Sequence, residues 1–191
     1  DHSSKLRLAW IYLIGGAIGL VAAFTMTVEK IEKLRNPGYV PSCSINPIIS
    51  CGSVMDSKQA AAFGFPNSLI GIGAFAIVAT VGLVMLCGFR LPRWFRLGLQ
   101  LGAAFGVFFV HWLIYSSLYR IHALCPYCIG VWIVTTIIFW YTTLDNMDQF
   151  PRLRTAAGAL EKIHTAVVVL WCAIIAGLIL QEFWDYWLTL V

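Results

Sequence analysis

Long apolar stretches alternate with short polar segments along the chain. Five of the apolar stretches are candidates for crossing a bilayer, at 8–28, 68–89, 97–118, 129–144 and 167–187. A spanning helix needs about 20 mainly apolar residues, because the hydrocarbon layer is roughly 30 Å thick. The first four stretches contain no Asp, Glu, Lys or Arg. The fourth is short, but it extends backward through two cysteines and a proline to give a span over 125–144.

The polar segments between these spans differ in character. The 29–67 segment holds turn residues followed by a short helical stretch over 53–63, for which Ser53 is a candidate N-cap. The 145–166 segment alternates apolar with basic residues, which is typical of a helix lying at the membrane interface. The pattern predicts an all-α membrane protein: a four-helix transmembrane bundle, a fifth transmembrane helix, and a half-helix in the first outward loop.

Composition agrees with a lipid environment. The chain is 60% hydrophobic and 12% charged, whereas soluble domains are roughly 45–50% apolar and about 25% charged. A water-soluble globular domain and a disordered chain are therefore both excluded. The net charge of +4 is small and the basic residues are scattered, which excludes a nucleic-acid-binding protein.

The distribution of Lys and Arg predicts the orientation. With five spans, the N-terminus, the 90–96 turn and the 145–166 segment share one face, which holds eight of the 13 basic residues, and the other face holds five. Cytoplasmic loops carry the excess of positive charge. We therefore expect a multi-pass protein of the inner membrane with a cytoplasmic N-terminus and with the 29–67 and 119–128 segments on the outer face.

Four of the six cysteines fall on the predicted outer face, where disulfides persist. Cys125 and Cys128 form a C-x-x-C unit at the start of the fourth span, with Pro126 in the first helical turn. The unpaired amides of a helix N-terminus stabilise a thiolate, and a lower thiol pKa favours thiol–disulfide exchange. This unit is therefore a candidate redox site.

Cys43 and Cys51 lie among turn residues in the first outward loop. A mobile loop that carries one dithiol beside a helix end that carries another favours a relay of disulfides. Two other interpretations stay open: a plain structural disulfide between the two loop cysteines, or a structural zinc site built from all four outer thiols. Cys87 and Cys172 lie inside spans and are expected to be apolar packing residues.

These features together resemble the vitamin K epoxide reductase family, most closely its bacterial members, which pass electrons from thiols to membrane quinones. The resemblance rests on two cysteines separated by seven residues after the first span, a half-helix leading to Asn67-Ser68, and a C-x-x-C unit that opens a later span. It covers roughly residues 9–145, so the fifth span lies outside it. DsbB-type quinone oxidoreductases instead carry their C-x-x-C unit in the first outward loop.

The resemblance implies a role for each outer cysteine. Cys43 would form a mixed disulfide with an external protein, Cys51 would exchange with Cys125, and Cys128 would be the thiol that meets the quinone. The implied activity is that of a membrane thiol-disulfide oxidoreductase, which reoxidises a separate, exported DsbA-like thioredoxin-fold protein. The electrons would pass to a membrane quinone of the menaquinone, ubiquinone or vitamin K type, and no metal is expected.

Several further residues are candidates for the quinone site. Asn67 matches a family asparagine whose amide bonds a quinone oxygen, although it is equally suited to capping the second span. Trp132 stands where family members that use vitamin K have a tyrosine. Because a quinone ring needs an apolar, aromatic-lined cavity, we expect the lining to include Met55, Phe63, Phe65, Phe75 and Trp132.

His111 lies inside the third span. Ionisable groups within membranes are functional candidates, and quinone reduction consumes protons, so a proton relay is one role for His111. A neutral imidazole bonded to a neighbouring helix is the other.

Two alternative functions stay open at this point. One is reduction of a vitamin K quinone or epoxide, and the other is a non-catalytic membrane protein with structural disulfides on its outer face.

Overall fold

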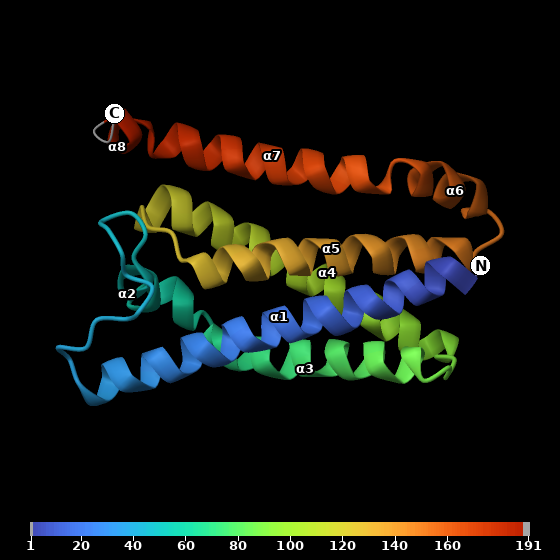
Figure 1. Ribbon diagram of the computed structural model, residues 1–191, viewed down its shortest axis with the longest axis horizontal. Helices are drawn as coiled ribbons and strands as arrows, with labels where there is room; N and C mark the ends of the chain where they lie inside the picture. Colours follow the sequence, from blue (N-terminus) through green and yellow to red (C-terminus); the bar gives the residue numbers. More distant parts are fainter. Residues whose placement is uncertain (1, 189–191) are drawn as a thin grey trace.

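The chain folds as an all-α membrane protein, in a computed structural model that describes residues 2–188 (Figure 1). Five helices are long and apolar enough to cross a membrane: α1 (His2–Arg35), α3 (Asn67–Leu86), α4 (Arg93–Ser116), α5 (Pro126–Asp148) and α7 (His164–Glu182). The first four form a bundle, and α7 lies along one side of it. The predicted fold class is confirmed.

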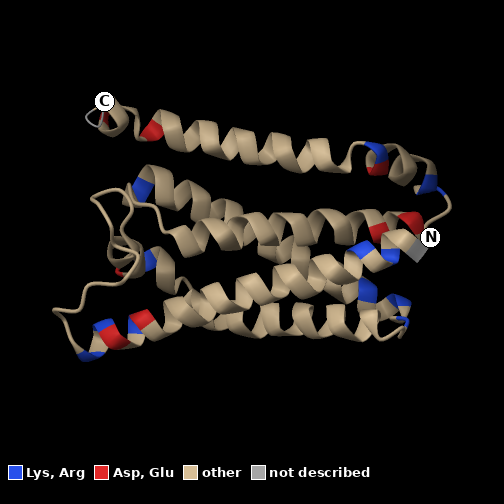
Figure 2. Cartoon of the chain, viewed as in Figure 1, with Lys and Arg blue, Asp and Glu red and all other residues tan. Residues whose placement is uncertain are grey.

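Charged residues gather at the two ends of this bundle, and its middle is uncharged (Figure 2). One end carries the start of α1, the turn between α3 and α4, and the short helix α6 (Arg154–Lys162). The other carries α2 (Cys51–Met55) and the start of α5, and we call it the cysteine end. An uncharged middle between two charged ends is the pattern that a bilayer selects, since charges inside hydrocarbon are costly.

The half-helix expected over 53–63 is divided in two. The helix α2 begins at Cys51, because the Ser50 hydroxyl caps it by accepting a hydrogen bond from the backbone N–H of Ser53. A 3-10 helix, η1 (Lys58–Ala61), follows, and the Ser57 hydroxyl caps it in the same way. The N-cap is therefore Ser50 rather than Ser53, and the second cap starts a separate helical turn.

At the cysteine end, α4 passes into a π-helical segment, η2 (Ser117–Ile121). His122 ends this segment with a left-handed backbone, φ 53°, and the Ser117 hydroxyl donates a hydrogen bond to the carbonyl of Ala123. These contacts reverse the chain at the cysteine end. The reversal brings residues 123–125 across the end of the bundle to the start of α5.

The helices α1 and α3 pack with their backbones in close approach. A Cβ atom on Gly16 would lie 2.6 Å from the backbone nitrogen of Ala79, and one on Gly82 would lie 2.5 Å from that of Leu13. No side chain larger than hydrogen fits such distances. The two glycines therefore join α1 and α3 into one closely packed pair.

The helix α7 is attached to the bundle at both ends. At the end opposite the cysteines, Arg7 pairs with Glu161 of α6, and the Tyr141 hydroxyl lies 2.5 Å from Nδ1 of His164. At the cysteine end, Phe183 is buried in a cluster that includes Leu118 and is followed by the short helix α8 (Trp184–Leu188). The fifth span thus ends at Glu182, before the expected limit at 187.

Candidate redox site

A parallel bridge between two segments far apart in sequence organises the cysteine end. Ile49 pairs with Leu124. The Leu124 N–H donates to the carbonyl of Ile48 over 2.7 Å, and the Ser50 N–H donates to the carbonyl of Leu124 over 3.0 Å. Cys51 follows Ser50 and Cys125 follows Leu124, so the bridge and its hydrogen bonds place these cysteines side by side.

Three sulfur atoms meet at this point. Cys43 and Cys51 form a disulfide, and the Sγ atoms of Cys51 and Cys125 lie 3.0 Å apart. All three Sγ atoms lie within 4.8 Å of one another. Cys51 and Cys125 are fully buried, and Cys43 is 6% exposed. A free thiol in contact with a disulfide is the arrangement from which thiol–disulfide exchange begins.

Cys125 is the N-cap residue of α5, and Pro126 occupies the first helical turn. A hydrogen bond from the Cys128 side chain lowers the pKa of Cys125 below its ordinary value, and the N–H groups of Tyr127 and Cys128 act in the same direction. Burial and the Glu29 carboxylate oppose this lowering of the pKa. The thiolate expected at this helix start is therefore favoured at the first cysteine of the C-x-x-C unit.

Cys128 lies one turn further along α5 and borders a large cavity. The cavity has a volume of about 770 Å³ and is enclosed by residues of α1, α3, α4 and α5. Of the four cysteines at this end, which all lie in the described part of the chain, Cys128 is the one on its lining. Its Sγ lies 3.6 Å from Sδ of Met26. Cys128 therefore stands between the sulfur contact and the cavity.

Four of the six residues expected at a quinone site lie on the cavity lining: Met55, Asn67, Phe75 and Trp132. Within residues 2–188, Phe63 and Phe65 are not on that lining. Their rings pack against each other at 6.4 Å between centroids, and Phe63 also packs at a tilt against Phe109 of α4, at 5.5 Å between centroids. Phe63 therefore connects the segment after η1 to α4.

Asn67 is the first residue of α3, and its side chain holds η1 in place. Its amide nitrogen donates to the carbonyl of Gln59 over 2.6 Å, and its amide oxygen accepts from the N–H of Ala62 over 3.1 Å. The residue at the N-cap position of α3 is Pro66. This contact is neither a cap of the second span nor a bond to a quinone; it links η1 to the start of α3. The bond from Asn67 to a quinone oxygen stays a prediction.

His111 faces α7. Its Nδ1 lies 2.7 Å from the carbonyl of Val107, and its Nε2 accepts a hydrogen bond from the indole N–H of Trp171 over 3.0 Å. A proton on Nδ1 and a lone pair on Nε2 satisfy both contacts, so this geometry is that of a neutral imidazole. Of the two roles considered for His111, the bond to a neighbouring helix has a described partner; the proton relay stays a prediction.

Glu29 is a buried carboxylate that the sequence reasoning missed. It is 6% exposed, and its oxygens accept hydrogen bonds from the backbone N–H of Ser42, at 3.1 and 3.3 Å, and from the Ser42 hydroxyl. Ser42 precedes Cys43, so α1 holds the loop disulfide through this contact. An acid directly after an apolar span could have drawn attention, but its partner 13 residues away had no sequence signal.

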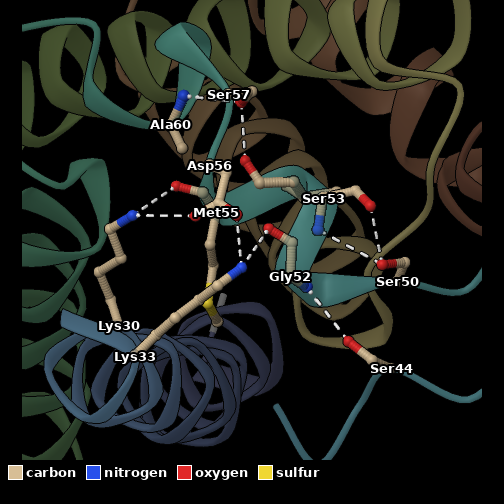
Figure 3. A network of polar contacts seen from close by, with 11 residues as sticks. Lys30, Lys33, Ser44, Ser50, Gly52, Ser53, Met55, Asp56, Ser57 and Ala60 are labelled. Atoms are coloured by element: carbon tan, nitrogen blue, oxygen red, sulfur yellow. Dashed lines mark hydrogen bonds and ion pairs between the residues drawn. The ribbon is translucent and has the colours of Figure 1, made fainter. Parts of the chain in front are cut away.

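Two lysines of α1 hold α2 from the other side (Figure 3). Lys30 donates to the carbonyl of Met55 over 3.0 Å, and Lys33 donates to that of Gly52 over 3.3 Å. Both also pair with Asp56, at 3.4 Å for Lys30. The hydrogen bond from Lys33 is the main cause that lowers the pKa of Asp56 below its ordinary value. These contacts attach the helix that carries Cys51 to α1.

The other two cysteines lie away from this site, and the disulfide bears on the zinc alternative. Cys87 is exposed at the end of α3, and Cys172 is partly buried on α7; both are free thiols. The disulfide between Cys43 and Cys51 leaves two free thiols at the cysteine end, so the form described does not offer the four thiolates of a structural zinc site. A structural disulfide alone would not require the third sulfur in contact with it.

Two dithiols in contact at one end of a transmembrane bundle, beside an apolar cavity, define a membrane thiol oxidoreductase. The chain matches the family model described as the vitamin K epoxide reductase family over residues 10–143, which is more than half of its length. It belongs to this family, as its motifs indicated. A search of curated proteins finds no match. The matched region runs from α1 to α5 and excludes α6, α7 and α8.

Proposed function

We propose that this protein reoxidises an exported DsbA-like thioredoxin-fold protein and passes the electrons to a membrane quinone. The observation that carries the proposal is the 3.0 Å contact between Cys51 and Cys125, one helical turn from the thiol that borders the cavity. This contact allows electrons to pass by thiol–disulfide exchange from the loop pair to the C-x-x-C pair. The apolar cavity beside Cys128 then offers a place for the electron acceptor.

The exchange steps balance as follows. The two thiols of the partner reduce the Cys43–Cys51 disulfide and become a disulfide themselves. The Cys51 thiolate then attacks Cys125 of an oxidised Cys125–Cys128 pair and releases Cys128 as a thiol. Attack by Cys43 on Cys51 restores the loop disulfide and releases Cys125. The form described, with a loop disulfide and two free thiols in the C-x-x-C unit, is the product of this transfer.

The last step takes two electrons and two protons from Cys125 and Cys128 to a quinone, which leaves as a quinol. The cavity supports a quinone as the acceptor, because it is large and is lined mainly by apolar side chains, Phe75 and Trp132 among them. The Asn67 amide nitrogen carries two hydrogens and uses one for Gln59. The other is suited to donate to a quinone oxygen.

The charge distribution supports an outer location for the cysteine end. Eight of the 13 Lys and Arg residues belong to the opposite end, where Figure 2 shows basic residues near the start of α1, around the start of α4 and around α6. We propose that this basic end faces the cytoplasm of a cell with an inner membrane. The cysteines would then face the compartment in which disulfides persist.

The proposal is tested with purified protein in lipid, a reduced DsbA-like partner and either menaquinone or ubiquinone. We expect quinone reduction by the wild type and by Cys172→Ser, the matched control on α7, and its loss in Cys128→Ser. Quinone reduction by Cys128→Ser at the wild-type rate would contradict the assigned terminal thiol. A parallel assay with vitamin K epoxide tests the alternative acceptor. Consumption of the epoxide but of neither quinone would contradict the proposal and favour epoxide reduction.

A further inference from the structure

The cysteine end concentrates sulfur beyond what the relay uses. Six sulfur-bearing side chains from α1, the first loop, α2 and α5 form one buried or partly buried cluster: Met26, Cys43, Cys51, Met55, Cys125 and Cys128. The chain has six Cys and four Met in total, so this cluster holds more than half of them. We call it the sulfur cluster.

The spacing of these sulfurs suits a metal ion. The Sγ atoms of Cys43, Cys51 and Cys125 lie within 4.8 Å of one another, and those of Cys51 and Cys125 are 3.0 Å apart. Reduction of the Cys43–Cys51 disulfide frees its two bonded sulfurs to move apart, and all three then become potential thiolate ligands, which bind a metal at about 2.3 Å. The Met26 thioether, 3.6 Å from Cys128, adds a neutral donor beside them.

The donor set selects the metal. Thiolates bind both Zn²⁺ and Cu(I), and the Met26 thioether beside Cys128 favours the softer Cu(I), because structural zinc sites are completed by thiolates or imidazoles. No His belongs to the sulfur cluster within the described residues. A thioether also completes coordination without adding negative charge to a buried site that already has the Glu29 carboxylate nearby.

We propose that the fully reduced protein binds one Cu(I) ion in the sulfur cluster, and that the metal-bound form is withdrawn from electron transfer. Binding replaces thiol protons by the metal and releases those protons, and it changes the oxidation state of neither copper nor sulfur. The loop disulfide excludes the ion, because it ties up two of the three closest sulfurs. The site is thus available only between reduction by the partner and reoxidation.

The test uses Cu(I) alone, held by a chromogenic chelator under nitrogen, with the full chain in detergent and neither quinone nor partner. Its outcome is therefore separate from that of the proposed function. We expect the reduced wild type to withdraw one Cu(I) per chain from the chelator and the disulfide form to withdraw none. Equal uptake by the oxidised and reduced forms would overturn the proposal.

Two methionine variants locate the ion. Met26→Leu keeps the side-chain volume close to that of methionine, and we expect it to lower the apparent Cu(I) affinity by roughly tenfold. Met85→Leu is the matched control, since Met85 packs in a separate cluster between α1 and α3, and it should bind Cu(I) as the wild type does. Equal affinities of the two variants would contradict the assigned site, as would loss of uptake in Cys172→Ser.

Copper occupancy should also block the thiols themselves. We expect Cu(I) to protect Cys51 and Cys125 of the reduced protein from alkylation and to leave Cys87 reactive, as measured by mass spectrometry. Zinc added in place of Cu(I) at the same concentration should protect them less. Protection by zinc that equals that by copper would contradict the selection of a soft monovalent ion.

Discussion

The two dithiols of this protein are held in different ways. Cys125 and Cys128 stand at the start of α5, where the helical backbone itself sets their separation. Cys43 and Cys51 lie in and after a loop, and side chains of α1 hold them, through Glu29 on one side and Lys30 and Lys33 on the other. The helix pair is positioned by local backbone geometry and the loop pair by tertiary polar contacts.

This difference matches the two steps of the proposed relay. Attack by an external protein needs an accessible sulfur, yet Cys43 is 6% exposed and Cys51 is fully buried in the closed arrangement. For the proposed exchange with a partner, the loop pair would therefore have to move, and a few polar contacts hold it in place in the structure. The helix pair stands at the start of α5, with Cys128 beside the cavity. A loop pair held by separable polar contacts and a helix pair held by its own backbone suit the proposed transfer from a soluble partner to a membrane acceptor.

The largest effect is expected from Cys51→Ser, which breaks the link between the two pairs. Quinone reduction should fall by at least about a thousand-fold, as for the loss of other catalytic nucleophiles. With the oxidised partner, the free Cys43 thiolate of this variant should attack the partner's disulfide and form a mixed disulfide, which releases one partner thiol, and Cys51 is no longer present to displace the partner. Non-reducing electrophoresis after incubation with the oxidised partner measures this, and Cys43→Ser is the control that should trap nothing. A partner trapped by Cys43→Ser instead would reverse the order of the loop cysteines.

Glu29→Ala tests how the loop pair is held. It leaves the Ser42 N–H without its acceptor, and an unpaired buried donor costs about 1–3 kcal/mol, which corresponds to a shift of roughly 5- to 150-fold toward the open loop. Glutathione should then reduce the Cys43–Cys51 disulfide faster by a factor in that range, as followed by alkylation of the released thiols. The control is Glu32→Ala, because Glu32 forms an exposed pair with Arg35. Equal rates in the two variants would show that Glu29 does not hold the loop.

Cys128→Ala should change the helix pair without opening the loop. The hydrogen bond from Cys128 is the main cause of the low pKa of Cys125, so its removal raises that pKa. The thiolate fraction rises with pH through the pKa, and the pH profile of Cys125 alkylation should therefore move to higher pH in Cys128→Ala. Cys128→Ser keeps a hydroxyl donor and should move it less. Coincident profiles for the wild type and Cys128→Ala would contradict this cause.

The smallest effect is expected from Asp56→Asn, which removes the ion pairs of α2 with α1. The Asp56 side chain is 55% exposed, so solvent screening limits the loss of stability to about 1 kcal/mol or less. The folded pKa of Asp56 is lowered, so its contribution is complete above the ordinary Asp value of about 4 and disappears as the pH falls through the lowered pKa.

Hydrogen exchange of the α2 amides measures this difference. The wild type and Asp56→Asn should differ near neutral pH and converge in acid or at high salt. Asp148→Asn is the control, since Asp148 pairs with Arg154 at the opposite end, and it should leave α2 unchanged. A difference between wild type and Asp56→Asn that persists in acid would contradict an electrostatic origin.

Much of the fold follows from local patterns in the sequence. Hydropathy is sufficient for the five spans, since each apolar stretch has to cover the same hydrocarbon thickness. The limits moved where polar residues continued or stopped a helix: α1 runs on to Arg35, and α7 ends at Glu182. The division of the expected half-helix could not be predicted, because any of three nearby serines could act as an N-cap. The extended backbone at Ser50 and at Ser57 makes these two the caps.

The site was predictable as far as its chemistry is local. The C-x-x-C unit at a helix start and the two loop cysteines were visible as motifs, and so was the family. The contacts that bring the dithiols together were not, because the bridge of Ile49 with Leu124 and the bond of Glu29 with Ser42 join positions that no periodicity relates. Whether the Phe63 and Phe65 side chains face the cavity likewise depends on how the chain folds after η1, which composition does not encode.

The glycine contacts between α1 and α3 have a consequence for how the cavity can vary. Side chains at Gly16 and Gly82 would collide with backbone, so the close packing of α1 against α3 cannot be loosened by substitution there without displacing a helix. The facing helix α4 contributes Gly98 and Gly102 to the lining, and an added Cβ at either meets nothing within 4 Å. Single substitutions at these two α4 positions therefore change the shape of the cavity and leave the packing of α1 against α3 intact.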